Sequence, residues 1–97
     1  MSIHITVLFT VVPDRLDASL TAFRELATHT RTEKGALRFD AFVAEEHADT
    51  VVLVEEWADQ EAIDLHMKEP WTAEFLERVE GAFAGSPQVY RIRPLDA

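Results

Sequence analysis

Three segments of the chain alternate in side-chain character with the two-residue period of a β-strand, and two helical patterns accompany them. The expected strands are Ile3–Val12, Leu37–Ala44 and Thr50–Trp57, with a fourth at Gln88–Arg93. Apolar residues at helical spacing predict one amphipathic helix after the first strand (Leu16, Leu20, Phe23, Ala27) and another that begins at Pro70 (Trp71, Phe75, Val79, Phe83). The resulting order, β-α-β-β-α-β, indicates an α+β chain of ferredoxin-like topology.

Local signals predict where these elements begin and end. Asp14 is placed to cap the first helix, and Asp59 to cap a short helix that reaches about Lys68. Gly35 is expected to adopt the left-handed conformation of a turn. The polar run Glu45–Asp49 predicts a hairpin loop between the second and third strands.

Length and charge limit the possible functions. Ninety-seven residues predict one domain over residues 1–97. The net charge of −9 disfavours binding to nucleic acid and to anionic membrane surfaces, because both need clustered cations. The sequence has no cysteine, no visible signal peptide and no apolar run long enough to span a bilayer, so we expect a cytoplasmic protein without membrane association.

Both faces of the expected sheet carry apolar side chains. Helices on one face leave the other open, and a large exposed apolar patch usually marks an interface. We therefore expect a homodimer that packs sheet against sheet around a cavity for a small-molecule substrate. The C-terminal strand near Val89–Arg93 is expected to help bridge the subunits.

Two residues are candidates for proton transfer. His66 lies on the short helix after the third strand, and imidazole moves protons near neutral pH. The structural alternative is a histidine that satisfies carbonyl groups at a helix C-terminus. Glu55 ends an apolar strand; a carboxylate in an apolar cavity has a raised pKa and can act as a base. Its structural alternative is a helix cap or a pairing with Arg38 or Arg91.

Other side chains are candidates for substrate contact. Flat aromatic substrates stack on aromatic side chains, although such residues more often belong to a core. Arg38 and Asp40 share a strand face and could hold a substrate carbonyl, or simply form a solvated ion pair. The aromatic candidates are Trp57, Trp71, Phe9 and Phe42. The four histidines show no metal-ligand spacing, so no metal site is expected.

Three short motifs resemble the antibiotic biosynthesis monooxygenase family. They are Glu33-x-Gly35-x-Leu37-Arg38-Phe39, Glu55-x-Trp57 and Ala62-Ile63-x-x-His66, and the order of elements agrees over nearly the whole chain. The family's Gly-Cys-Leu-x-Tyr core reads Gly35-Ala36-Leu37-Arg38-Phe39, so the usual Cys and Tyr are replaced. The resemblance implies a dimeric α+β barrel and selects Glu55 over Glu56 as the glutamate of the Glu-x-Trp motif.

The resemblance implies two enzymatic functions, and a third, non-enzymatic function stays open beside them. The first is a cofactor-independent monooxygenase acting on an aromatic, polyketide-like or quinol substrate, in which the substrate carbanion activates oxygen inside a dry cavity. The second is an isomerase of a small phosphorylated dione. The third is a non-catalytic ligand-binding or stress-response dimer. The haem-degrading branch of the family is disfavoured, because the segment 71–84 has no axial histidine.

Overall fold

The computed structural model describes residues 1–96 and has the predicted order of elements. The strands are β1 (Ile3–Thr10), β2 (Ala36–Ala44), β3 (His47–Trp57) and β4 (Gln88–Ile92). The helices are the short 3-10 helix η1 (Pro13–Arg15), α1 (Leu16–Thr30), α2 (Gln60–His66) and α3 (Pro70–Arg78).

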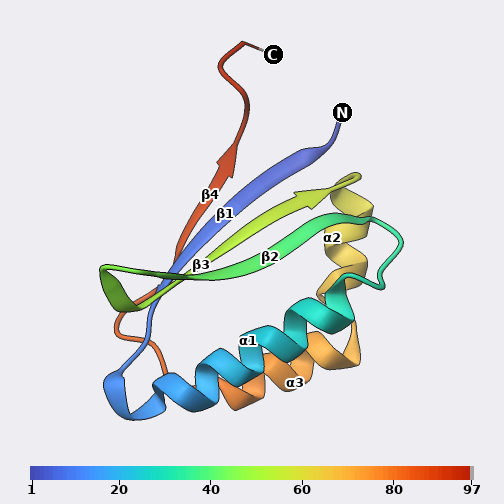
Figure 1. Ribbon diagram of the computed structural model, residues 1–97. Helices are drawn as coiled ribbons and strands as arrows, with labels where there is room; N and C mark the ends of the chain where they lie inside the picture. The colour runs from blue at the N-terminus through green and yellow to red at the C-terminus, as the bar shows by residue number, and fades with distance from the viewer. Residues whose placement is uncertain (97) are drawn as a thin grey trace.

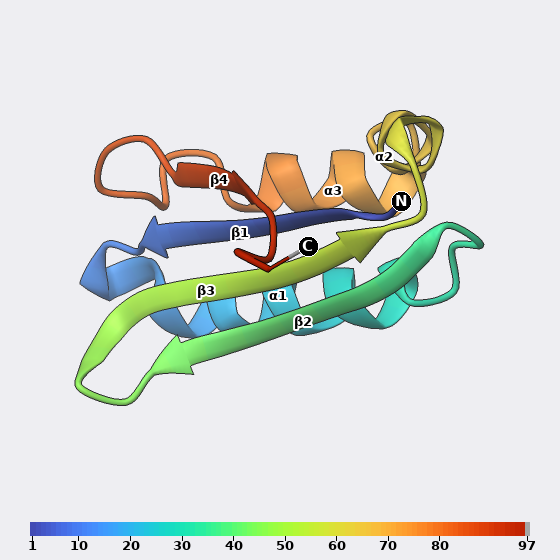
Figure 2. The ribbon, with the colours of Figure 1, turned by 90° about the horizontal axis from the view of Figure 1, so that it is seen from above.

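The four strands form one antiparallel sheet in the order β2-β3-β1-β4. Helices α1 and α3 lie side by side beneath one face, and α2 stands at the end of the sheet where β3 finishes (Figure 1). The view onto the opposite face shows the sheet with no helix in front of it (Figure 2). The protein therefore has the α+β ferredoxin-like fold that the order of elements predicts.

The core lies between the sheet and the helices. Alternate residues of β3 are buried on the helix-covered face, at Val51, Leu53, Glu55 and Trp57. Phe23 of α1 packs against Phe9 of β1 and Phe75 of α3, with ring centroids 5.0 and 4.9 Å apart. The predicted period-two alternation of β3 is thus confirmed, with Glu55 and Trp57 on the helix-covered face and Glu56 on the open face.

Several predicted boundaries are wrong. The hairpin loop is shorter than Glu45–Asp49, because β3 already begins at His47 and only a tight turn remains. The second amphipathic helix ends at Arg78, whereas the apolar spacing continued to Phe83. Phe83 instead forms an isolated β-bridge with Val11, which follows β1. Apolar spacing indicates which side chains face the core. Side chains continue to face the core after α3 has ended, so the spacing overestimated the length of the helix.

Gly35 is not left-handed, which corrects the prediction; the glycines with positive φ are Gly81 and Gly85. Gly35 is needed because its backbone lies very close to α2. A Cβ on Gly35 would lie 2.2 Å from Cβ of Ala62. The carbonyl of Gly35 accepts a hydrogen bond from the amide of Ala58 at 2.9 Å. The lack of a side chain at Gly35 therefore lets the loop after α1 touch α2.

The cap at Asp59 is confirmed, whereas the cap at Asp14 is wrong. The Asp59 side chain accepts the amide of Ala62 at 2.9 Å, as an N-cap should. Asp14 lies inside η1, and α1 begins after Arg15 with no side-chain cap.

We expect Asp59→Ala to lower the free energy of unfolding by about 0.5–2 kcal/mol in denaturant titrations. Asp14→Ala is the matched control and should change it little; equal losses in both variants would contradict this reading.

Within residues 1–96, no helix combines the length and the apolar character needed to cross a lipid bilayer.

Candidate functional site

His66 is the last residue of α2 and turns inward at the end of the sheet. The residue is 7% exposed. Its imidazole packs against the rings of Trp57 and Phe39, with centroid distances of 4.7 and 5.7 Å. The short α2 is oriented by the Asp59 cap and by the contact of Ala62 with Gly35. His66 is therefore held in an aromatic environment.

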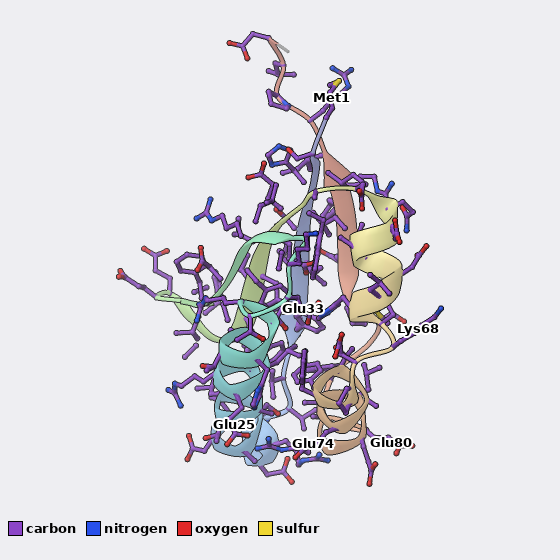
Figure 3. All side chains as sticks on the ribbon, turned by 90° about the vertical axis from the view of Figure 1, so that its right-hand side faces the viewer. Met1, Glu25, Glu33, Lys68, Glu74 and Glu80 are labelled. Carbon is purple, nitrogen blue, oxygen red and sulfur yellow. The ribbon has the colours of Figure 1, made fainter. Side chains whose placement is uncertain are left out.

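Glu33 binds His66 directly and is a site residue that the sequence patterns did not predict. Its Oε2 and Oε1 lie 2.9 and 3.1 Å from Nδ1 of His66. Trp71 of α3 donates its indole N–H to the same Oε2 at 2.7 Å. Glu33 lies in the loop that follows α1, close to α2 and to α3 (Figure 3). The only sequence signal was its place at the start of the Glu33-x-Gly35 motif, since the partners lie 33 and 38 residues away along the chain.

Glu55 is the second carboxylate of the site and lies on the buried face of β3. It is 9% exposed and stands between Ile5 of β1 and Phe39 of β2 in the sheet register. Nε1 of Trp57 donates to its Oε1 at 2.8 Å. Burial raises the pKa of the Glu55 carboxyl above its usual range, against smaller opposing effects of the Trp57 hydrogen bond and the nearby His66. The environment thus favours a neutral carboxylic acid more than water does.

The raised pKa of Glu55 predicts a pH-dependent difference between variants. A raised carboxyl pKa contributes stability that is present below the unfolded-state value, near 4.5, and is lost as pH rises through the folded-state value. The stability of Glu55→Gln relative to wild type should therefore increase as pH rises across that window, measured by urea unfolding at several pH values.

The pKa of the Asp40 carboxyl is shifted in the opposite direction to that of Glu55. The hydrogen bond from Arg38 lowers the pKa of the Asp40 carboxyl, so its contribution is present above the unfolded-state value and is lost as pH falls. The free energy of unfolding of Asp40→Asn should therefore fall slightly relative to that of wild type as pH rises from the folded-state pKa of Asp40 to its unfolded-state pKa. Parallel trends for the two variants would contradict the assignment.

The other predicted site residues divide between two faces of the sheet. Trp57 packs against His66, and Trp71 shares the Glu33 carboxylate with it. Phe9 is on the same face but packs against Phe23 and Phe83, away from His66. Arg38, Asp40 and Phe42 are on the open face, where their strand neighbours are Glu56, Val54 and Val52. Arg38 donates to Asp40 at 2.8 Å, and both side chains are partly exposed.

The alternation of β2 is interrupted at its start. Ala36 and Arg38 pair with successive residues of β3, Trp57 and Glu56, so Leu37 is an extra residue in a bulge. Leu37 is 56% exposed and does not share the buried face with Phe39 as the period predicted.

A surface groove runs between the loop after α1 and α2, next to the buried site. Two adjoining cavities of about 370 and 320 Å³ share Lys34, Gly35, Ala62 and Leu65. Glu33 and Trp71 line the second cavity, whereas His66 lines neither. The remaining charged lining residues are acidic: Asp59, Glu61 and Glu69. The groove reaches the buried histidine through Glu33.

The arrangement suits proton transfer. The imidazole of His66 contacts the Glu33 carboxylate and lies near Glu55, and each of these largely buried glutamates is held by a tryptophan N–H. A desolvated imidazole beside carboxylates can exchange protons with a bound substrate. Within the described part of the chain, no three His, Asp or Glu side chains are grouped as metal ligands would be.

Comparison with solved structures agrees with this fold. A crystal structure of an antibiotic biosynthesis monooxygenase superposes with a TM-score of 0.89 at 24% identity, covering 98% of this chain and 99% of that one. Rv0793 from Mycobacterium tuberculosis superposes with a TM-score of 0.89 at 23% identity, covering 100% and 98%. PA3566 from Pseudomonas aeruginosa gives 0.90 at 19%, covering 97% and 94%. At these identities the likeness shows the fold alone.

Sequence comparison identifies the family. The chain is 30% identical to "Putative monooxygenase YcnE" of Bacillus subtilis (strain 168) over 56 residues, which are 58% of this chain and 59% of that protein. The sequence model described as "Antibiotic biosynthesis monooxygenase" matches residues 2–78, a range that contains Glu33, Glu55, Trp57, His66 and Trp71. By fold and by sequence, the chain belongs to the antibiotic biosynthesis monooxygenase family.

Proposed function

We propose that the protein is a cofactor-independent monooxygenase that oxidises a flat, aromatic or quinol-like substrate next to His66. The observation that carries this proposal is the burial of His66 against two aromatic rings, in contact with Glu33 and near Glu55. Family membership and the name of the Bacillus subtilis relative support the same reaction class.

In the proposed reaction His66 removes a proton from an acidic C–H or O–H group of the substrate. The resulting carbanion gives its electrons to molecular oxygen. For a methylene group, one oxygen atom enters the substrate as a carbonyl and the other leaves as water with the two hydrogens. Glu55, whose burial favours the neutral form, donates a hydrogen bond to the substrate oxygen on which charge develops.

The surroundings of the site disfavour the isomerase of a phosphorylated dione. Lys34 is the one cation among the residues that line the groove, which also has several carboxylates. Arg38, the basic residue of the Gly35–Phe39 motif, lies on the opposite face of the sheet and pairs with Asp40. A phosphate monoester near His66 would therefore meet more negative than positive charge.

The test is turnover of polycyclic hydroxylated aromatic compounds with an acidic methylene group, under oxygen-18 gas without added flavin, haem or metal. We expect one labelled oxygen atom in the product and no turnover under argon. Unlabelled product, or equal turnover under argon, would overturn the oxygenase proposal. Tight binding of these compounds without any turnover would overturn it in favour of a ligand-binding protein.

A homodimer through the open sheet face is part of the proposal. Phe42, Tyr90 and Ile92 are about half exposed there, at 49%, 51% and 50%. Leu8 and Val52 share this face between them. Such an apolar patch fits a second copy of the same face. A cytoplasmic location and a single domain over residues 1–97 remain predictions from the sequence.

We expect sedimentation velocity at micromolar concentration to show a dimer. Tyr90→Lys on the open face should shift the protein towards monomer, because it places charge in the interface. Leu76→Lys is the matched control, since Leu76 is similarly exposed on α3 at 53%. A wild-type monomer would contradict the dimer.

A further inference from the structure

We propose that Glu33 is a positioning residue, which fixes the His66 tautomer that carries its proton on Nδ1 and so presents the Nε2 lone pair as the base. The inference rests on the proposed function for its catalytic meaning. It adds a residue to the site and specifies which ring nitrogen reacts.

The hydrogen bonds of the carboxylate determine the tautomer. An ionised carboxylate only accepts hydrogen bonds, and both Glu33 oxygens lie within 3.1 Å of Nδ1. Nδ1 is therefore the nitrogen that donates. In neutral imidazole the other nitrogen is then an acceptor. No hydrogen-bond partner for Nε2 occurs among residues 1–96, so its lone pair is left for a substrate.

The carboxylate is itself fixed from a second side. Trp71 donates to Oε2 at 2.7 Å, and this tryptophan follows Pro70 in the first turn of α3. The side chains of Glu33 and His66 are each 9% exposed, so little water competes for these bonds. Glu33 thus joins three segments of the chain: the loop after α1, the end of α2 and the start of α3.

The contacts of Nδ1 oppose the alternative orientation of the His66 ring. A 180° rotation of the imidazole would turn a ring carbon towards Glu33, and the buried carboxylate would lose the hydrogen bond from His66. Trp57 and Phe39 pack against the ring at 4.7 and 5.7 Å. Thr72 Oγ1 lies 3.5 Å from Nδ1, on the same side as Glu33. The contacts therefore favour one orientation and one tautomer.

The test is nitrogen-15 NMR of the histidine side chains in wild type and in Glu33→Gln, without substrate. We expect wild-type His66 to show a protonated Nδ1 and an unprotonated Nε2 at a pH where the ring is neutral. In Glu33→Gln the amide can donate to Nδ1 as well as accept from it, so the Nε2-protonated tautomer should appear. Glu69→Gln is the matched control, because it removes a different carboxylate that lines the same groove. The His66 signals of Glu69→Gln should be the same as those of wild type.

The outcomes are separable from those of the proposed function. A wild-type His66 protonated on Nε2, or an unchanged spectrum in Glu33→Gln, would overturn the positioning role. The wild-type measurement decides even if Glu33→Gln fails to fold. With a substrate in hand, Glu33→Gln should also lower kcat about 10- to 100-fold at little cost in KM, as expected when the orienting partner of a functional histidine is lost. If His66 proves dispensable for turnover, its proposed role as the base falls and the tautomer result stands.

Discussion

Replacing His66 with asparagine is expected to lower turnover about 100- to 10,000-fold, the usual contribution of a positioned acid or base. Asparagine keeps an N–H near the position of Nδ1, so the hydrogen bond to Glu33 is retained while the basic nitrogen is lost. Steady-state kinetics on an accepted substrate would measure the loss, with circular dichroism and melting curves to confirm the fold.

His47→Asn is the matched control for His66→Asn. His47 is exposed at the start of β3, at the opposite end of the strand from Trp57, and its replacement should leave turnover near wild type. Turnover of His66→Asn within a few-fold of wild type, together with a lowered melting temperature, would assign His66 a structural role only.

Gly35→Ala is expected to lower the free energy of unfolding strongly, although it adds only one methyl group. The new Cβ would lie 2.2 Å from Cβ of Ala62, and the loop after α1 must move away from α2. Overpacking of this kind costs about 1–3 kcal/mol, and each kcal/mol lowers the melting temperature of a domain this size by about 4–8 °C. The displacement also moves Glu33, so turnover should fall with stability.

A double-mutant cycle with Ala62→Gly tests the cause. Ala62→Gly alone should destabilise α2 by about 1 kcal/mol through helix propensity. Combined with Gly35→Ala it removes the clash, so the double variant should be more stable than the sum of the two single losses predicts. Strict additivity would show that Gly35 acts through its backbone freedom rather than through this contact.

Sequence patterns predicted the features of the fold that depend on near neighbours. The alternation of Val51, Leu53, Glu55 and Trp57 follows from the strand period, which also puts Glu55 and Glu56 on opposite faces. The Asp59 cap needs only a side-chain acceptor three residues before a free amide. Asp14 offered the same local pattern, yet the chain first forms η1 and begins α1 only after Arg15.

The features that depend on distant contacts were not predictable. Nothing near Glu33 in the sequence indicates that it meets His66 and Trp71, because the three come together only when α2 and α3 pack beside the loop. The role of Gly35 depends on Ala62 in the same way. Periodicity grouped Arg38, Asp40 and Phe42 on one face, but only the register with β3 shows that this face is opposite His66.

The pairing of each buried glutamate with an indole N–H makes the site visible to spectroscopy. The chain contains two tryptophans, and they are the donors to Glu55 and Glu33. Indole emission responds to nearby charge and to stacked rings, so occupation of the site by an aromatic compound should change the intrinsic fluorescence. Trp71→Phe would leave Trp57 as the only indole, and its emission would report on the surroundings of Glu55. Ligand screening can therefore begin with the unlabelled protein, before any turnover is known.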